Sequence, residues 1–124
     1  MQKYIDGFVL PISKAHLAEY ERAASKIAEV WKDYGALEYY ECTGDELYLE
    51  GVRSFMEVLD VKEDEVVVFG WVVFPSKEVR DQANEKVPND PRMSELVAPL
   101  IKPERLIFNA GRMVYGGFKT LVHA

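Results

Sequence analysis

The sequence predicts an α+β protein of the ferredoxin-like type, in which a four-stranded antiparallel sheet carries its helices on one face. Its segments follow the order β-α-β-β-α-β, which is the split βαβ pattern. A strand expected at 65–74 is apolar on both sides, so the sheet needs a cover on the face that the helices leave open. The chain has 124 residues, a length that fits one domain spanning 1–124.

The chain opens with a strand that is followed by a long helix. β-Branched and aromatic residues at 3–10 predict the strand, and Pro11 is expected to end it. Apolar residues then recur at spacings of three and four as far as Tyr34, which predicts a helix with Ser13 as its N-cap. Gly35 follows at the position where a left-handed C-terminal cap belongs.

Two further strands are expected at 36–43 and 65–74, with an insertion at 44–64 between them. The insertion is too long for a plain turn. Ser54 and Glu57 have the spacing of a capping box, which predicts one or two helical turns at 55–59.

The last part of the chain predicts a helix at 76–87, a short helix at 91–97 and a final strand at 112–122. Ser76 is the expected N-cap of the first helix, and an aspartate–proline pair begins the second. Two prolines between the short helix and the last strand indicate an irregular crossing.

Both long helices are expected on the same face of the sheet, because crossovers between parallel strands are almost always right-handed. The other face then presents one apolar side of the strand at 65–74 to water. Leaving these side chains exposed forfeits at most about 1.5–3 kcal/mol each, and the sum rivals the ~5–15 kcal/mol stability of a whole domain. The side chains concerned are those of Val67, Phe69, Trp71 and Val73.

We therefore expect a homodimer in which a second copy covers the open face, since two-fold pairs are the commonest soluble oligomers. The alternative is that the insertion at 44–64 folds back over this face. The few apolar residues and many charges of the insertion favour the homodimer.

The composition argues against several classes of partner. The net charge is −6, and the basic residues are scattered among more numerous carboxylates, so neither nucleic acid nor an anionic membrane is expected. The longest apolar run, at 66–74, is far shorter than the ~20 residues of a membrane helix. The N-terminal residues show no signal-peptide core, and a single cysteine allows no internal disulfide, so we expect a cytoplasmic protein.

No metal site and no cofactor are expected. A metal site needs converging ligands at suitable spacing, and the sequence shows no such cluster. The two histidines, His16 and His123, are expected at the surface. The single cysteine, Cys42, is expected to be a small buried thiol, because free cysteines are among the most buried residues.

Asp6 is the candidate catalytic residue, because it interrupts an otherwise apolar strand. If it lies on the open face, burial in the dimer raises its pKa and suits it to proton transfer. The alternative is a structural ion pair with Lys119, or a position at the rim. The aromatic residues assigned to the same face serve equally well as interface core. The expected lining of a ligand-binding barrel on this face is Asp6, Phe8, Tyr39, Glu41, Phe69, Trp71, Tyr115 and Lys119.

The sequence resembles the YbaA-like family of small bacterial proteins over nearly its whole length. The segments that carry the resemblance, in the same order as in that family, are 4–9, 35–39, 68–72, 89–92 and 112–118. The resemblance implies membership of the dimeric α/β-barrel superfamily, and hence a ferredoxin-like subunit and a homodimer. It implies no catalytic residue, and Asn109 stands where the family's aspartate is expected. The superfamily also includes haem proteins, but neither histidine is expected at an axial position inside the barrel.

Two kinds of function stay open. One is a homodimer that binds or transforms a small, partly apolar molecule without a tightly bound cofactor. If such a protein is an enzyme, the resemblance implies chemistry like that of cofactor-free monooxygenases or isomerases. The other is a non-enzymatic dimer with a structural or stress-related role, or a module that binds a partner through the acidic insertion at 44–64.

Overall fold

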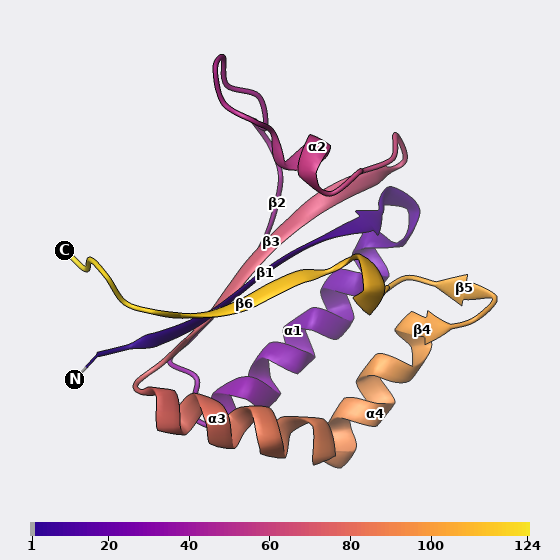
Figure 1. The fold of residues 1–124 in the computed structure, drawn as a ribbon. Coiled ribbons are helices and arrows are strands. Elements are labelled where there is room, and N and C mark those ends of the chain that lie inside the picture. The colour runs from indigo at the N-terminus through magenta and orange to yellow at the C-terminus, as the bar shows by residue number, and fades with distance from the viewer. Residues whose placement is uncertain (1) are drawn as a thin grey trace.

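The computed structural model describes residues 2–124 and contains a four-stranded sheet (Figure 1). Its strands lie in the order β2-β3-β1-β6, and every neighbouring pair is antiparallel. This order confirms the predicted ferredoxin-like fold, with β1 and β3 in the centre of the sheet. The strands are β1 (Tyr4–Ser13), β2 (Glu38–Thr43), β3 (Glu65–Phe74) and β6 (Val114–Lys119).

Three helices lie on one face of the sheet, including the two long ones as predicted, and a fourth, short helix lies on the other side (Figure 1). The first three are α1 (Leu17–Asp33), α3 (Lys77–Lys86) and α4 (Pro91–Val97), and the fourth is α2 (Phe55–Val58). None of the helices in residues 2–124 is both long and apolar enough to cross a membrane. The short elements are the 3-10 helices η1 (Lys14–His16), η2 (Val87–Asn89), η3 (Ala98–Leu100) and η4 (Ala110–Arg112), and the hairpin of β4 (Ile101–Lys102) and β5 (Arg105–Leu106).

Most helix ends lie where the sequence predicts them. The Ser76 hydroxyl accepts a hydrogen bond from the Val79 backbone N–H at 3.2 Å, which caps α3. Ser54 caps α2 in the same way. Gly35 follows α1 with a φ of +110°, a left-handed conformation that favours glycine.

Two predicted boundaries near the N-terminus are wrong. β1 continues through Pro11 to Ser13, because β6 pairs only with residues 4–9 and leaves one side of β1 without a neighbouring strand there. A proline, which has no N–H to donate, is tolerated at such a free edge. Ser13 makes no capping hydrogen bond, and α1 begins at Leu17 after the turn of η1.

The core lies between the sheet and the helices, in two clusters that Phe8 contacts jointly. One cluster surrounds Leu10 and Ile12 of β1, and the other surrounds Phe74 of β3, which is fully buried. The Trp31 ring of α1 meets the Phe74 ring edge-on at 6.2 Å. The strand residues of both clusters lie on the helix-covered face of the sheet.

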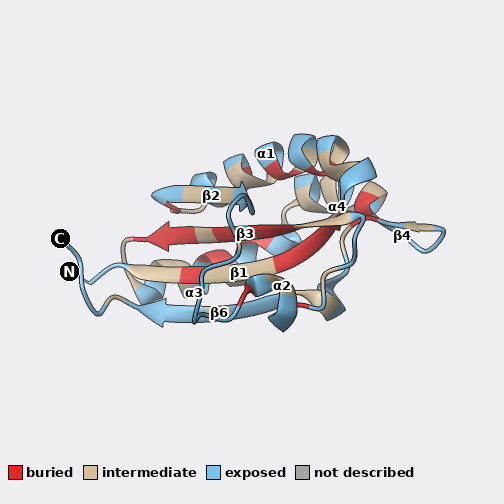
Figure 2. Cartoon of the chain, turned by 90° about the horizontal axis from the view of Figure 1, so that it is seen from above, coloured by how far each residue is buried: buried red, intermediate tan, exposed pale blue. Residues whose placement is uncertain are grey.

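The insertion covers one part of the open face, as the view onto the sheet shows (Figure 2). The Phe55 ring of α2 packs edge-on against Phe69, with the ring centroids 5.9 Å apart. The expectation of an apolar side exposed along all of β3 is wrong for Val67 and Val73, which are both buried. Phe69, in contrast, stays 43% exposed. The apolar residues still exposed on the neighbouring strands of this face are Tyr40, Val114 and Phe118.

Candidate functional site

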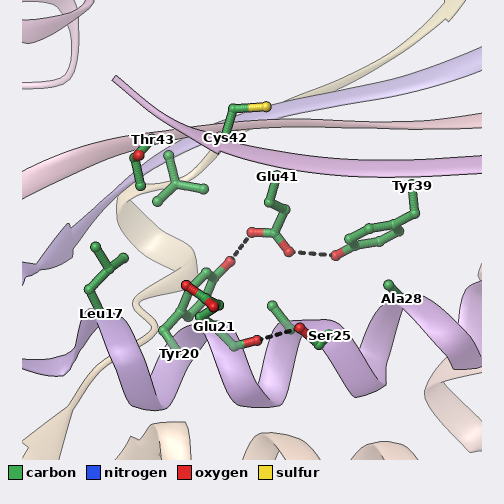
Figure 3. A pocket seen from close by; sticks show the side chains of 11 residues that line it. Leu17, Tyr20, Glu21, Ser25, Ala28, Tyr39, Glu41, Cys42 and Thr43 are labelled. Atoms are coloured by element: carbon green, nitrogen blue, oxygen red, sulfur yellow. Dashed lines mark hydrogen bonds between the residues drawn. The ribbon is translucent and has the colours of Figure 1, made fainter. Parts of the chain in front are cut away.

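A pocket of about 230 Å³ opens between α1 and the edge strand β2 (Figure 3). Leu17, Ala24 and Ala28 of α1 and Val68 of β3 form its apolar walls. Because β2 is the last strand of the sheet on this side, no further strand closes the pocket. The polar side chains that line it are Tyr20, Glu21 and Ser25 from α1, and Tyr39, Glu41 and Thr43 from β2.

Glu41 lies between two tyrosine hydroxyl groups in this pocket (Figure 3). The Tyr39 hydroxyl donates a hydrogen bond to Glu41 Oε2 at 2.7 Å, and the Tyr20 hydroxyl donates one to Oε1. Tyr39 and Glu41 are two residues apart on β2, so their side chains project from the same face of the sheet. Tyr20 belongs to the apolar stripe of α1 and reaches Glu41 from the facing helix.

The electrostatics of the pocket follow from this arrangement. Burial raises the pKa of Glu41, while the hydrogen bonds from Tyr20 and Tyr39 favour the charged form and offset part of that rise. The pKa values of Tyr20 and Tyr39 are raised as well, chiefly by burial and then by the neighbouring Glu41. Both phenols therefore keep their protons and continue to donate to the carboxylate.

A carboxylate held in this way can act on an occupant of the pocket. Each oxygen of Glu41 has a second lone pair that can accept a hydrogen bond or a proton. Carboxylates with a pKa raised by burial in a pocket are typical of functional sites. Within residues 2–124, no three side chains of His, Cys, Asp or Glu come together in a way that could hold a metal ion.

A second hollow, of about 380 Å³, lies on the open face of the sheet and is almost entirely apolar. Trp71 stacks on Tyr40 with the ring centroids 4.8 Å apart, and it lies 5.6 Å from the Phe69 ring. Residues from β1, β3 and β6 line this hollow: Ile5, Gly7, Phe8, Val9, Phe69, Trp71, Val114, Tyr115, Gly116 and Phe118.

The strands present the residues of the predicted barrel lining on both faces of the sheet, so the prediction that they share the open face is wrong, although Phe8, Phe69, Trp71 and Tyr115 line the hollow together. Residues paired across neighbouring strands project from the same face, and Trp71 pairs with Gly7 whereas Asp6 pairs with Val72. Phe69 and Trp71 therefore lie on the open face, and the other residues of the predicted set lie on the opposite face. The predicted phase of β3 relative to its neighbouring strands is off by one residue, which exchanges the two faces. The members of the set on the helix-covered face are Asp6, Phe8, Tyr39, Glu41, Tyr115 and Lys119. A role of these residues in ligand binding stays a prediction.

Asp6 is buried beneath α3 rather than placed at the open face. The Arg80 Nε atom donates a hydrogen bond to Asp6 Oδ1 at 3.0 Å, and Arg80 also lies over the Tyr4 ring. Asp6 thus forms a structural ion pair, the kind of interaction weighed as the alternative, but with Arg80 instead of Lys119. Gly117 leaves the space for Arg80, because a Cβ atom there would lie 2.0 Å from Arg80 Nη2.

Sequence reasoning missed the two features that depend on contacts across the sheet. Tyr20 occupies one of the periodic positions that predict the first helix, and no pattern in the sequence connects it with Glu41. The expectation of a buried Cys42 is wrong, because Cys42 is exposed on the edge strand and its side chain points away from the pocket (Figure 3). Of the two histidines, His123 is exposed and His16 is half-buried.

The comparison with protein families places this chain among known relatives. A family described as "Protein of unknown function (DUF1428)" matches residues 3–102. The chain belongs to this family. A relative of the chain in Escherichia coli strain K12, described as "Uncharacterized protein YbaA", is 39% identical over 120 residues, which are 97% of either protein. A protein of the same description in Shigella flexneri shows the same identity and coverage. The resemblance to the YbaA-like family is thereby confirmed.

Solved structures support the fold of this DUF1428 protein. It is similar to a NIPSNAP-family protein of unknown function from Agrobacterium tumefaciens, with a TM-score of 0.54 and 13% sequence identity. That similarity covers 95% of this chain and 87% of the other. At this level of identity the likeness concerns the fold alone.

Proposed function

We propose that the protein is a homodimer whose subunits each bind a small, partly apolar molecule between α1 and β2. The observation that carries the proposal is Glu41, a carboxylate held by Tyr20 and Tyr39 in a pocket with apolar walls. An apolar cavity with a few convergent polar groups and a perturbed pKa is the usual form of a small-molecule site. The pocket between α1 and β2 has a volume of about 230 Å³. It is smaller than the ~300–1,000 Å³ pockets that take drug-sized ligands, so it fits a smaller molecule.

The pocket is tested by screening a library of small aromatic and aliphatic fragments by amide NMR. We expect chemical-shift changes at residues of α1 and β2 that line the pocket. Ala28→Leu fills the pocket from its wall and should abolish these changes. Ala18→Leu places the same side chain at an exposed position of the same helix and should preserve them. Binding that survives Ala28→Leu, or no binding at all, contradicts the proposal.

A second copy of the chain is the proposed cover of the open face. The face carries an apolar hollow of about 380 Å³ lined by Phe69 and Trp71, and contiguous exposed apolar surface of this kind marks interaction sites. The insertion projects from the same side of the sheet (Figure 1), and its apolar residues Tyr48, Leu49 and Val52 are exposed. Sedimentation velocity of the wild-type chain at micromolar concentration tests the pairing, and a stable single subunit contradicts it.

A further inference from the structure

The hydrogen bonds in the α1–β2 pocket decide which chemical groups an occupant can offer to it. A tyrosine hydroxyl has a single hydrogen to donate, and Tyr20 and Tyr39 each donate theirs to Glu41. The Ser25 hydroxyl donates to the Glu21 backbone carbonyl at 2.9 Å. These three hydroxyls therefore present only lone pairs to the interior of the pocket.

The charged side chains that line the pocket are also hydrogen-bond acceptors. Glu21 and Glu41 are carboxylates, which in the ionised form accept hydrogen bonds and donate none. Among the described residues, no lysine, arginine or histidine lines the pocket. The Thr43 hydroxyl is the remaining oxygen donor of the lining side chains. A ligand that brings its own acceptors or a negative charge finds almost no side-chain donor here.

The structure assigns the pocket to a small organic ammonium ion, a protonated amine attached to an apolar body. This inference rests on the proposed function and specifies the ligand class of the same site. The ammonium group donates to the free lone pairs of Glu41, flanked by the acceptor oxygens of Tyr20 and Tyr39. The apolar body lies against Leu17, Ala24 and Val68. Burying a carboxylate without a partner costs free energy, because the charge loses its contact with water. A bound positive charge offsets part of this cost.

Pairs of ligands that differ chiefly in charge test whether the pocket prefers an ammonium group, without any change to the protein. Benzylamine, which is protonated at neutral pH, and benzyl alcohol have nearly the same shape, as do butylamine and butanol. We expect each amine to bind the wild-type pocket about tenfold or more tightly than its alcohol, because hydrogen bonds to charged groups inside a protein are the strong ones. Benzoate, an anion of similar size, should not bind. Affinities come from amide NMR titrations at one salt concentration.

Two variants locate the effect at Glu41. Glu41→Gln keeps the shape of the side chain and should remove the preference of the pocket for amine over alcohol. Glu21→Gln removes an exposed carboxylate at the edge of the same pocket and should retain most of that preference. Equal loss in both variants would show a general attraction of cations to an acidic surface, and would overturn the assignment.

The outcomes separate this inference from the proposed function. If alcohols or other neutral fragments bind the pocket as tightly as amines, the ammonium assignment is wrong and the small-molecule site stands. If neither amines nor any fragment causes shifts that Ala28→Leu removes, both are wrong. The comparison of amine with alcohol on the wild-type chain is decisive even if Glu41→Gln does not fold.

Discussion

At the scale of single residues, Glu41 shows how the charge state of a side chain is set by its neighbours. Burial raises its pKa, and the two tyrosine hydrogen bonds act in the opposite direction. A group whose folded pKa lies above its ordinary value of about 4.5 binds its proton more tightly in the folded chain. The contribution of Glu41 to stability therefore falls as pH rises from that ordinary value to the raised folded value.

Removing one tyrosine hydroxyl should shift this balance. In Tyr39→Phe, Glu41 loses a donor that favours its charged form, so its pKa should rise further above the ordinary value. Titration of the Glu41 side-chain carboxyl by ¹³C NMR measures the change. Tyr40→Phe is the matched control, because the Tyr40 ring stacks on Trp71 at the other face of the sheet. A pKa of Glu41 that is the same in Tyr39→Phe and in the wild type would contradict the role given to this hydrogen bond.

Asp6 and Cys42 show why residue type alone does not locate a site. An acidic residue in an apolar strand is compatible with a position in an interface or with an ion pair beneath a helix. The contact with Arg80 shows that Asp6 forms the ion pair. A lone cysteine is usually buried, but Cys42 lies on an edge strand at the face that the helices do not cover. In both cases, the deciding neighbour is distant in the sequence.

At the scale of secondary-structure elements, local signals predicted the type and order of the strands and helices well. Hydrophobic periodicity and the capping residues Ser54, Ser76 and Gly35 act within a few positions, so they can be read without the fold. The start of α1 could not be predicted in this way. Ser13 has the residue type of an N-cap, but it is held in β1 by pairing with Glu65.

The two serines provide a direct comparison of predicted and observed caps. Ser76→Ala removes a capping bond to the Val79 N–H and should lower the free energy of unfolding by about 1 kcal/mol. Ser13→Ala removes a hydroxyl that caps nothing, and surface changes of this kind usually stay within about 0.5 kcal/mol. Urea denaturation of the two variants and the wild type measures both effects. Equal losses would show that the Ser76 bond does not stabilise α3.

At the scale of the whole molecule, the distribution of apolar side chains decides what the sheet can do. One face is packed against α1, α3 and α4 except at the pocket beside β2, and the insertion shields only the end of the other face near Phe69. The hollows on the two faces differ in chemistry. The pocket beside α1 holds a carboxylate, and the hollow on the open face is apolar.

A charge on the open face should separate the proposed dimer. Phe118 is 60% exposed in the single chain, so Phe118→Glu should leave the subunit folded. Burying the new carboxylate in an interface should cost about 3 kcal/mol or more, which weakens dimerisation about 100-fold. Sedimentation velocity and circular dichroism measure assembly and folding separately. Leu106→Glu, at an exposed position outside the main sheet, is the control and should still pair. An unchanged dimer in Phe118→Glu would place the interface elsewhere.

The sequence by itself determined the class of the fold, the order of its elements and the excess of apolar residues on β3. These properties follow from local periodicity, capping and composition. Only the tertiary structure decided which face each strand residue occupies, how far the insertion reaches over the sheet, and that Glu41 meets Tyr20 and Tyr39. The physical reason is that side chains alternate at every residue of a strand, so a shift of one position in the pairing exchanges the two faces. That phase is set by contacts between strands and helices far apart in the chain.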